Sequence, residues 1–323
     1  MTRHSRPTRR AQRGAALLMA LIIVTVISTL AVSMVWQQWR AVQVESAERA
    51  RQQSAWILTG ALAWTRIILK EDLRPSNPDK TDNLGEPWAV PLSEARLSTF
   101  LAADKDNTDD APDTFLSGNI TDAQSRFNLS NMVTVTNNVP TAVVDEVAAF
   151  QRLCGFLNLS ATVAQQISKG FLESTPPHTG VANPPLRPER LDQLAWFGVD
   201  LKTIKQLEPY VVILPQTSAT QVNVNTASRE VIAAVAKVDL ATAERIVQMR
   251  GREHFKNISD ATTRLGGNIV LSTTQLSVAS SFFIINGRLR LNNQVLEQRS
   301  LVERQGRDVV PRSREWVNSS DPG

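Results

Sequence analysis

The fold is decided near the N-terminus by residues 15–36, which read AALLMALIIVTVISTLAVSMVW. No residue between Ala15 and Trp39 carries a formal charge, and this run is twenty-five residues long. A helix of that length spans about 37 Å at a rise of ~1.5 Å per residue, whereas the hydrocarbon core of a bilayer is about 30 Å thick. Residues 15–39 are therefore predicted to form a transmembrane helix.

The residues that precede this helix are basic. The first fourteen residues contain no acid and five arginines, which are Arg3, Arg6, Arg9, Arg10 and Arg13. The formal charge of the chain is +4, and without these arginines it is −1. Basic flanks stay on the cytoplasmic side, so the N-terminus is predicted to be cytoplasmic and the bulk of the chain to lie across the membrane. The nearly neutral remainder offers no general electrostatic argument for nucleic-acid binding.

Gly14 stands directly between the basic leader and the apolar run. A short basic leader that ends in Gly and is followed at once by a hydrophobic helix resembles the prepilin class. The resemblance implies cleavage between Gly14 and Ala15 by a prepilin peptidase of the bacterial inner membrane, and methylation of the new N-terminus at Ala15. The alternatives are an ordinary secretory signal, whose apolar region is shorter, and an uncleaved signal anchor.

Met19 occupies the fifth position after the expected cleavage site, where prepilins usually carry Glu. A carboxylate inside the bilayer is costly unless it is paired, and in pilin-like filaments it is thought to pair with the terminal amine of the preceding subunit. A subunit without this Glu needs no predecessor. In this respect the chain resembles pseudopilin K of the type II secretion system, which lacks the Glu and is placed first, at the tip.

Helical spacing continues beyond the membrane segment. The apolar residues that recur at three-to-four spacing are Ile57, Leu58, Ala61, Leu62, Ile68 and Leu69. Pro75 and Pro78 then end the pattern. Residues 40–74 are therefore predicted to be a periplasmic continuation of the same helix.

The next stretch, residues 75–118, is rich in Pro, Asp and Asn, and is predicted as loop with a short helix near Leu92 to Leu101. An acidic run resembles a calcium loop but lacks the central Gly and closing Glu of an EF-hand. Its weak candidate ligands are Asp104, Asp106, Asp109 and Asp110. Pseudopilin K usually binds calcium in its helical domain, but the matching stretch here, residues 168–180, retains one acid, Glu173. No metal or other cofactor is predicted, with calcium as the weak alternative.

A motif follows at residues 120–132, ITDAQSRFNLSNM, which closely resembles the DxQxRFNLNNL signature of pseudopilin K. Phe127 and Leu129 would face one side of a short strand, and the Asn and Ser residues favour a turn after it. We interpret the motif as structural, because nothing in it resembles a catalytic grouping.

Residues 140–271 show mainly helical spacing and are predicted to form an inserted helical domain. The expected helices are Val143 to Leu157, Ala161 to Leu172, Pro188 to Phe197, Leu201 to Pro209, Ser228 to Ala236 and Ala241 to Arg250. The single cysteine, Cys154, lies in an apolar helical pattern and is predicted to be a buried thiol without a reactive role.

Residues 272–323 are predicted to be antiparallel strands. One hairpin is expected from residues 281–285 and 288–291 around Asn286-Gly287, because this pair suits a type I′ turn. A second is expected from residues 300–304 and 308–316 around Gln305-Gly306, with Pro311 placing the last strand at a sheet edge.

The segment Val222 to Ser228, VNVNTAS, also resembles the opening of a helix-hairpin-helix DNA-binding module. Thr226 or Ser228 would cap the following helix, which explains the segment as a helix start. The turn that would contact phosphate, residues 237–240, contains no Gly and includes Asp239. Pseudopilin K carries a similar segment, so DNA binding through Arg245, Arg250 and Arg252 stays an alternative.

These observations predict an α+β, pilin-like fold with a long N-terminal transmembrane helix, an antiparallel β-sheet head and a large inserted all-α domain. The expected parts are a leader (1–14), the membrane helix (15–39), its continuation (40–74), the first part of the head (75–139), the helical insertion (140–271) and the terminal strands (272–323). The sequence shows no Walker, dinucleotide or zinc spacing and no nucleophile paired with a base, so no enzyme is predicted.

The resemblance implies a minor pseudopilin that starts and caps a periplasmic pseudopilus together with I- and J-type minor pseudopilins. The alternatives are a minor pilin of a type IV pilus and the membrane-anchored DNA-binding protein.

Overall fold

The computed structural model describes residues 9–73, 80–97, 114–177, 183–215, 219–266, 269–291 and 294–317. The chain divides into two compact units, of which the first ends at Ile57 and the second begins at Leu58.

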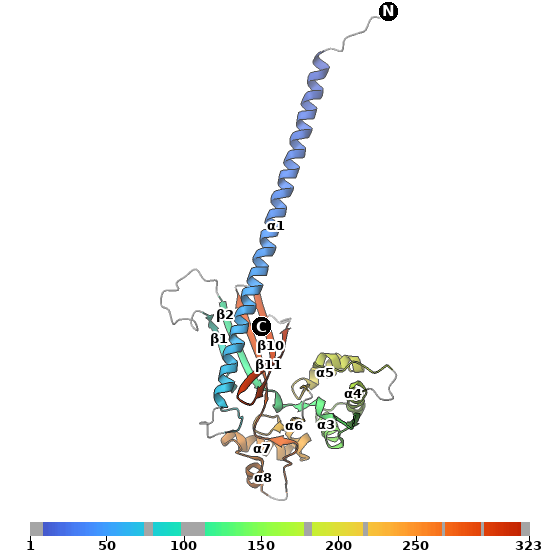
Figure 1. Ribbon diagram of the computed structural model, residues 1–323, viewed down its shortest axis with the longest axis vertical. Helices are drawn as coiled ribbons and strands as arrows, with labels where there is room; N and C mark the ends of the chain where they lie inside the picture. The colour runs from blue at the N-terminus through green and yellow to red at the C-terminus, as the bar shows by residue number, and fades with distance from the viewer. Residues whose placement is uncertain are drawn as a thin grey trace, which may run out of the picture. The chain divides into compact units, whose positions relative to one another are not determined.

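Helix α1 runs from Arg9 to Asp72 (Figure 1). Its apolar part contains two hydroxyl side chains whose hydrogen-bonding needs are met within the helix, since Thr25 Oγ1 donates to the Ile22 carbonyl at 2.8 Å and Thr29 Oγ1 to the Val26 carbonyl at 2.9 Å. The prediction that the membrane helix continues without a break beyond residue 39 is confirmed, and the helix ends at Asp72, close to the expected end at residue 74. The helix begins earlier than expected, at Arg9 instead of Ala15, so part of the basic leader is helical.

The second unit contains a five-stranded antiparallel sheet in the order β1-β2-β9-β10-β11. Its strands are β1 (Leu92–Arg96), β2 (Thr114–Asp122), β9 (Phe282–Leu291), β10 (Gln294–Gln305) and β11 (Asp308–Val317). Strands β2 and β9 are neighbours in the sheet although the whole helical region separates them in the sequence. The helical region is therefore an insertion between two paired strands.

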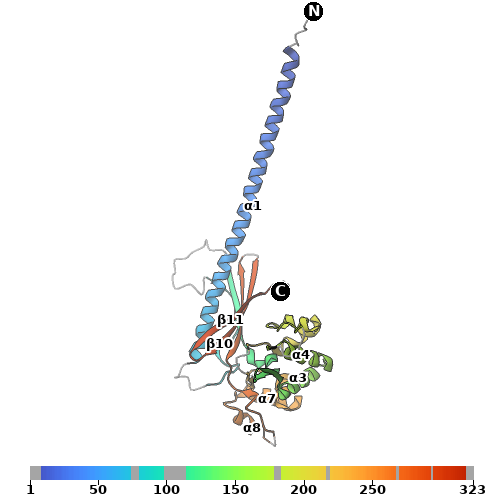
Figure 2. The same ribbon diagram turned by 45° about the vertical axis from the view of Figure 1, so that its right-hand side comes forward.

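The part of α1 that belongs to the second unit packs on this sheet, as both views show (Figures 1 and 2). One hydrophobic core joins the helix, the short helix η1 (Pro87–Ala89) and the sheet. Its buried members are Leu62, Leu69, Trp88, Ile120, Phe283, Ile285, Val302 and Val309. The alternation expected for a sheet with one covered face is visible at Phe283 and Ile285, which stand two residues apart.

Two predictions in this sheet are wrong. The first part of the helix expected near Leu92 to Leu101 is strand β1, because its edge pairing with β2 outweighs a weak helical pattern, and residues 98–101 lie outside the described residues. Asn286-Gly287 is not a turn: both residues lie within the continuous strand β9. Gly287 is paired with Gly118 on β2, and a Cβ on Gly118 would lie 2.6 Å from the Asn286 carbonyl oxygen. Here glycine permits close backbone approach rather than a reversal of the chain.

The second predicted hairpin is confirmed. Strands β10 and β11 meet at residues 306–307, where Gly306 has a positive φ of 60°. Pro311 lies in β11, which is an edge strand as expected.

The helical region has its own core and gathers beyond one end of the sheet (Figures 1 and 2). Its helices are α3 (Val144–Phe156), α4 (Ala161–Ser174), η4 (Leu191–Phe197), α5 (Leu201–Leu207), α6 (Arg229–Ala236), α7 (Leu240–Arg252) and α8 (Ile258–Leu265). The six predicted helices are confirmed within a few residues, although η4 is a 3₁₀ helix. Helix α8 was not predicted, because it is short and its apolar residues are only Ile258, Ala261 and Leu265.

Short strands tie the helical region together. Strand β3 (Phe127–Asn128) pairs in parallel with β6 (Val211–Val212), and β7 (Val222–Asn223) with β8 (Leu276–Ser277). Strands β4 (Val133–Thr136) and β5 (Val139–Ala142) form a hairpin. Two 3₁₀ turns, η2 (Ala123–Ser125) and η3 (Leu129–Met132), flank β3.

Candidate functional site

The membrane helix is the first functional element. The span Ala15–Asp72 contains a window with a mean hydropathy of 2.7, none of which is buried within the protein. Met19 is 69% exposed, and Ala15 is exposed as well. The Gly14–Ala15 bond lies inside α1. An apolar helix of this length that is exposed along its described residues is suited to a bilayer or to neighbouring membrane helices.

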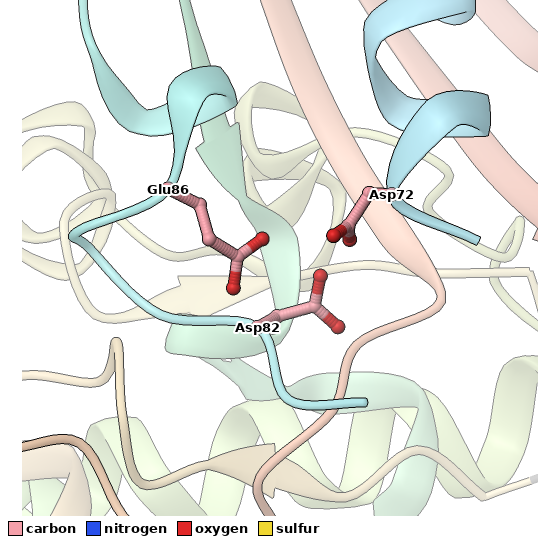
Figure 3. A group of neighbouring side chains, drawn as sticks. All are labelled: Asp72, Asp82 and Glu86. Carbon is pink, nitrogen blue, oxygen red and sulfur yellow. The ribbon is translucent and has the colours of Figure 1, made fainter. Parts of the chain in front are cut away.

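A second element is a group of three carboxylates in the second unit. Asp72 ends α1, while Asp82 and Glu86 lie in the segment before η1, and the three side chains point toward one another (Figure 3). One carboxylate oxygen from each lies within 4.8 Å of the others. Such a group resembles a site for a hard cation, so its other partners decide its role.

Arg304 on strand β10 supplies positive charge to this group. Its Nη1 lies 2.5 Å from Asp82 Oδ1 and its Nη2 lies 2.7 Å from Asp72 Oδ2. The guanidinium also stacks over the ring of Phe283, 4.4 Å from the centroid. Arg304 thus binds two of the carboxylates at once and supplies the positive charge that a metal ion would bring to the group. We therefore assign the three acids to an ionic junction with Arg304.

Glu86 is held by neutral donors. Its Oε1 accepts hydrogen bonds from the backbone and side-chain nitrogens of Asn83, both at 2.9 Å, and its Oε2 accepts one from Trp88 Nε1 at 2.6 Å. Burial, followed by the charge of Asp72, raises the pKa of Glu86 to about 8. Burial raises the pKa of Asp82 to about 6 even though Arg304 opposes the shift. The proton that Glu86 retains relieves repulsion within the group.

Asp122 continues this junction into the helical region. Its Oδ2 accepts hydrogen bonds from Asn223 Nδ2 at 3.0 Å, Thr226 Oγ1 at 2.6 Å and Ser280 Oγ at 2.7 Å, and its Oδ1 accepts one from the Gln124 backbone at 2.7 Å. Ser280 also donates its backbone N–H to Asp82 Oδ2 at 2.7 Å. Burial raises the pKa of Asp122, and these four donors oppose that rise.

The two segments singled out in the sequence therefore meet at one buried network. Asp122 and Gln124 come from the motif at residues 120–132, and Asn223 and Thr226 come from VNVNTAS. Gln124 strengthens the connection, because its Nε2 donates to the Gln221 carbonyl at 2.7 Å and its Oε1 accepts from the Ser281 backbone at 2.6 Å. The structural interpretation of both segments is supported, and the network fixes the inserted region to the sheet.

The sequence offered no signal for the junction of Asp72, Asp82 and Arg304, since ion pairs across 222 and 232 residues leave no local pattern. The weak calcium candidates Asp104, Asp106, Asp109 and Asp110 lie outside the described residues. Glu173, the one acid retained in the stretch that matches the calcium-binding region of pseudopilin K, lies in α4, 3.7 Å from Lys169.

The geometry of VNVNTAS favours a helix start. Ser228 Oγ accepts from the Val231 backbone at 3.4 Å, and Thr226 instead bonds Asp122. In the turn that would face phosphate, Asp239 accepts from the Thr242 backbone at 2.8 Å and caps α7. Arg250 Nη1 bonds the Val224 carbonyl at 2.5 Å, so it is engaged inside the protein rather than in a basic surface patch.

Comparisons with known proteins agree with these features. A family model described as type II secretion system (T2SS), protein K matches residues 222–279, which begin with VNVNTAS and end beside Ser280. A curated protein named type II secretion system protein K from Pseudomonas aeruginosa is 26% identical over 314 residues, covering 88% of this chain and 87% of its own. The protein of the same name from Pectobacterium carotovorum is 25% identical, covering 95% of this chain and 97% of its own.

A solved structure shares the fold. A chain of the GspK-GspI-GspJ complex from the type 2 secretion system of enterotoxigenic Escherichia coli superimposes with a TM-score of 0.63 at 19% identity. The match covers 84% of the present chain and 99% of that chain.

An apolar helix, an antiparallel sheet packed on its end and an inserted helical region define a membrane-anchored protein of the pilin-like class. Within this class the chain is a relative of type II secretion system protein K, as its motifs predicted. It is a minor pseudopilin, a structural component of the secretion machinery.

Proposed function

We propose that this chain starts and caps a periplasmic pseudopilus in complex with I- and J-type minor pseudopilins. The observation that carries the proposal is Met19, which is exposed on the membrane helix where filament subunits carry Glu. Without a carboxylate at this position the helix presents no acceptor for the terminal amine of an earlier subunit. The chain can therefore stand first in the filament.

The proposed topology follows from the flanking charge. The arginines before Ala15 keep the N-terminus in the cytoplasm, and the sheet and helical region lie in the periplasm. Prepilin peptidase removes residues 1–14 at the Gly14–Ala15 bond and methylates Ala15. Because the bond lies inside α1, cleavage requires this turn of the helix to open in the protease.

The inserted helical region supports the capping role. It is fastened to the sheet by the Asp122 network, so it forms one compact unit with the sheet rather than a tethered module. A filament subunit that carries this additional mass leaves less room for another subunit above it.

Co-expression tests the proposal. The full chain is produced with the I- and J-type minor pseudopilins of the same secretion system, extracted in mild detergent and purified through a tag on this chain alone. We expect a stable complex of all three, and Met19→Leu should preserve it because Leu matches Met in size and polarity. If the chain is recovered with neither the I-type nor the J-type pseudopilin bound, the proposal is contradicted.

A further inference from the structure

A groove of about 760 Å³ lies between the helical region and strands β9, β10 and β11 of the sheet. One wall consists of η4 and α5, and the other of strands β9, β10 and β11. From β10 only Arg299 and Leu301 line it, two residues apart, which is the spacing of one strand face. From β11 five consecutive residues line it, namely 313–317. Consecutive residues belong to both faces, so the groove runs along the free edge of β11.

Arg126 lies in the wall of this groove and is half-buried. Among the residues that the structure describes, its guanidinium donates no hydrogen bond and forms no ion pair. Burial and the neighbouring charge of Arg299 both lower its pKa, but an arginine cannot lose its proton under ordinary conditions. The negative charge of Glu208 opposes this lowering of the pKa, but Glu208 is already paired with Arg299, with 3.3 Å between Oε1 and Nη1. A half-buried cation that forms no ion pair among the described residues is suited to an anionic ligand.

The other charges of the groove leave an excess of positive charge. Arg190 is paired with Asp192 at 2.7 Å and lies 4.0 Å from Glu315. The ionisable side chains on the groove that form no such ion pair among the described residues are Arg126, Lys205, Arg314 and Glu189. A ligand that carries negative charge is therefore complementary to the groove.

The free edge of β11 indicates what kind of anion fits. Strand β11 pairs with β10 on one side and is the last strand of the sheet. Pro311 and Arg312 protect the first half of this edge against pairing with other chains. The half that lines the groove, residues 313–317, has no proline, and it carries Trp316, which is 50% exposed. An exposed aromatic side chain beside backbone groups that pair with no further strand among the described residues is suited to an extended peptide.

We propose that this groove binds an extended acidic segment of another protein, which adds a strand to the edge of β11 and places a carboxylate on Arg126. The occupant is identified by its chemistry alone, an extended backbone with a carboxylate side chain. The inference stands apart from the proposed role in the pseudopilus, because it depends only on the groove.

The test measures binding of a labelled probe peptide to the full chain in detergent by fluorescence anisotropy. The probe alternates Glu and Val over eight residues, and a matched probe replaces each Glu by Gln. We expect the Gln probe to bind about tenfold more weakly, which is about 1.4 kcal/mol, because it loses the charge-assisted hydrogen bond to Arg126. A third probe with alternate amide nitrogens methylated cannot pair with a strand and should not bind. Equal binding of the Glu and Gln probes, or full binding of the methylated probe, would overturn the proposal.

Variants of the chain assign the effect to Arg126. Arg126→Gln should weaken binding of the Glu probe by about tenfold without lowering the melting temperature, because the guanidinium forms no hydrogen bond or ion pair with the described residues that the change would remove. Arg245→Gln on α7, far from the groove lining, is the matched control and should leave the affinity within about twofold. Glu208→Gln should tighten binding, since it frees Arg299 for the peptide. Loss of affinity in Glu208→Gln, or none in Arg126→Gln, would contradict the assignment.

A shortened chain that ends at Val317 separates binding in trans from binding by the chain's own terminus. The removed residues, 318–323, include Asp321. We expect the shortened chain to bind the Glu probe as the full chain does. A probe that binds only after this shortening would assign the groove to the terminus and overturn the proposal.

Discussion

Asn223 Nδ2 lies 3.0 Å from Asp122 Oδ2, although 101 residues separate the two in the sequence. Asp122 ends strand β2, and Asn223 ends strand β7. The hydrogen bond therefore connects the sheet that packs on α1 with the inserted helical region. Around it, Thr226 and Ser280 satisfy the same carboxylate oxygen, so the connection is a buried network rather than a single contact.

Asp122→Ala should be strongly destabilising. The change leaves the Ser280 hydroxyl and the Gln124 backbone N–H buried without their carboxylate acceptor, and each such group costs about 1–3 kcal/mol. Thr226 Oγ1 keeps only its 3.4 Å contact with the Asn223 carbonyl, whereas Asn223 Nδ2 still donates to the Asp82 carbonyl. We expect the free energy of unfolding of the detergent-solubilised chain in urea to fall by about 3 kcal/mol or more. Asp200→Ala, which removes only an exposed helix cap, should cost about 1 kcal/mol. Equal losses in the two variants would contradict the role of the network.

The stability of the second unit should fall as the pH rises from about 5 to 8. Glu86 and Asp82 have folded-state pKa values of about 8 and about 6, above their ordinary values of 4.5 and 3.8. The folded state therefore binds more protons than the unfolded state in this range, and raising the pH favours unfolding. Melting temperatures across the range measure the effect.

Glu86→Gln isolates the contribution of that residue to the pH dependence. Gln cannot ionise, so the decline in melting temperature between pH 5 and pH 8 should become shallower. Glu253→Gln, at an exposed position, should leave the slope unchanged and serves as the control. An identical slope in the Glu86→Gln variant and the unmodified chain would show that the junction does not retain the proton.

Gly118→Ala should destabilise the sheet, whereas the same substitution at Gly155, where a Cβ has free space, should not. A Cβ at Gly118 would lie 2.6 Å from a backbone oxygen of β9, which cannot move without disturbing the pairing. We expect a loss of about 1–3 kcal/mol in the free energy of unfolding. Gly155 on α3 has nothing within 4 Å of the position that a Cβ would take, and Gly155→Ala should stabilise the chain by about 0.5–1 kcal/mol.

Cys154 should be inert in the folded protein. Its side chain is buried in the core of the helical region, and burial raises the pKa of the thiol to about 12. Maleimide labelling at pH 7 should therefore be slow in the folded chain and fast in denaturant. Comparable rates in the two conditions would contradict the packing of α3.

The elements that sequence patterns predicted share a local cause. The membrane helix follows from an uninterrupted apolar run, the helices from their spacing and caps, and the hairpin of β10 and β11 from Gly306 at its turn. The errors arise where tertiary contacts determine the local structure. Asn286-Gly287 has the composition of a turn, but both residues continue strand β9, because β2 pairs closely with them through Gly118 and because Leu58 packs 3.1 Å from the position that a Cβ on Gly287 would take.

The candidate site was predictable only in part. Asp122, Gln124 and Thr226 lie in segments that attracted attention because they resemble known motifs, yet no pattern indicated that the segments meet. Arg304, Asp72 and Asp82 carried no signal, because an ion pair between strand β10 and the end of α1 depends on the folded chain. Arg126 belongs to a predicted motif, but only the structure shows that its charge is unpaired within the described residues.

The N-terminus of the mature protein shows whether this chain is processed and assembled as a prepilin. Intact mass analysis of the chain extracted from the membranes of its own cells should find a protein that begins at Ala15 and carries one methyl group. Gly14→Val, which adds a branched side chain at the cleavage site, should leave the leader attached. A mature chain that still begins at Met1, or one cut beyond the apolar run, would contradict the account.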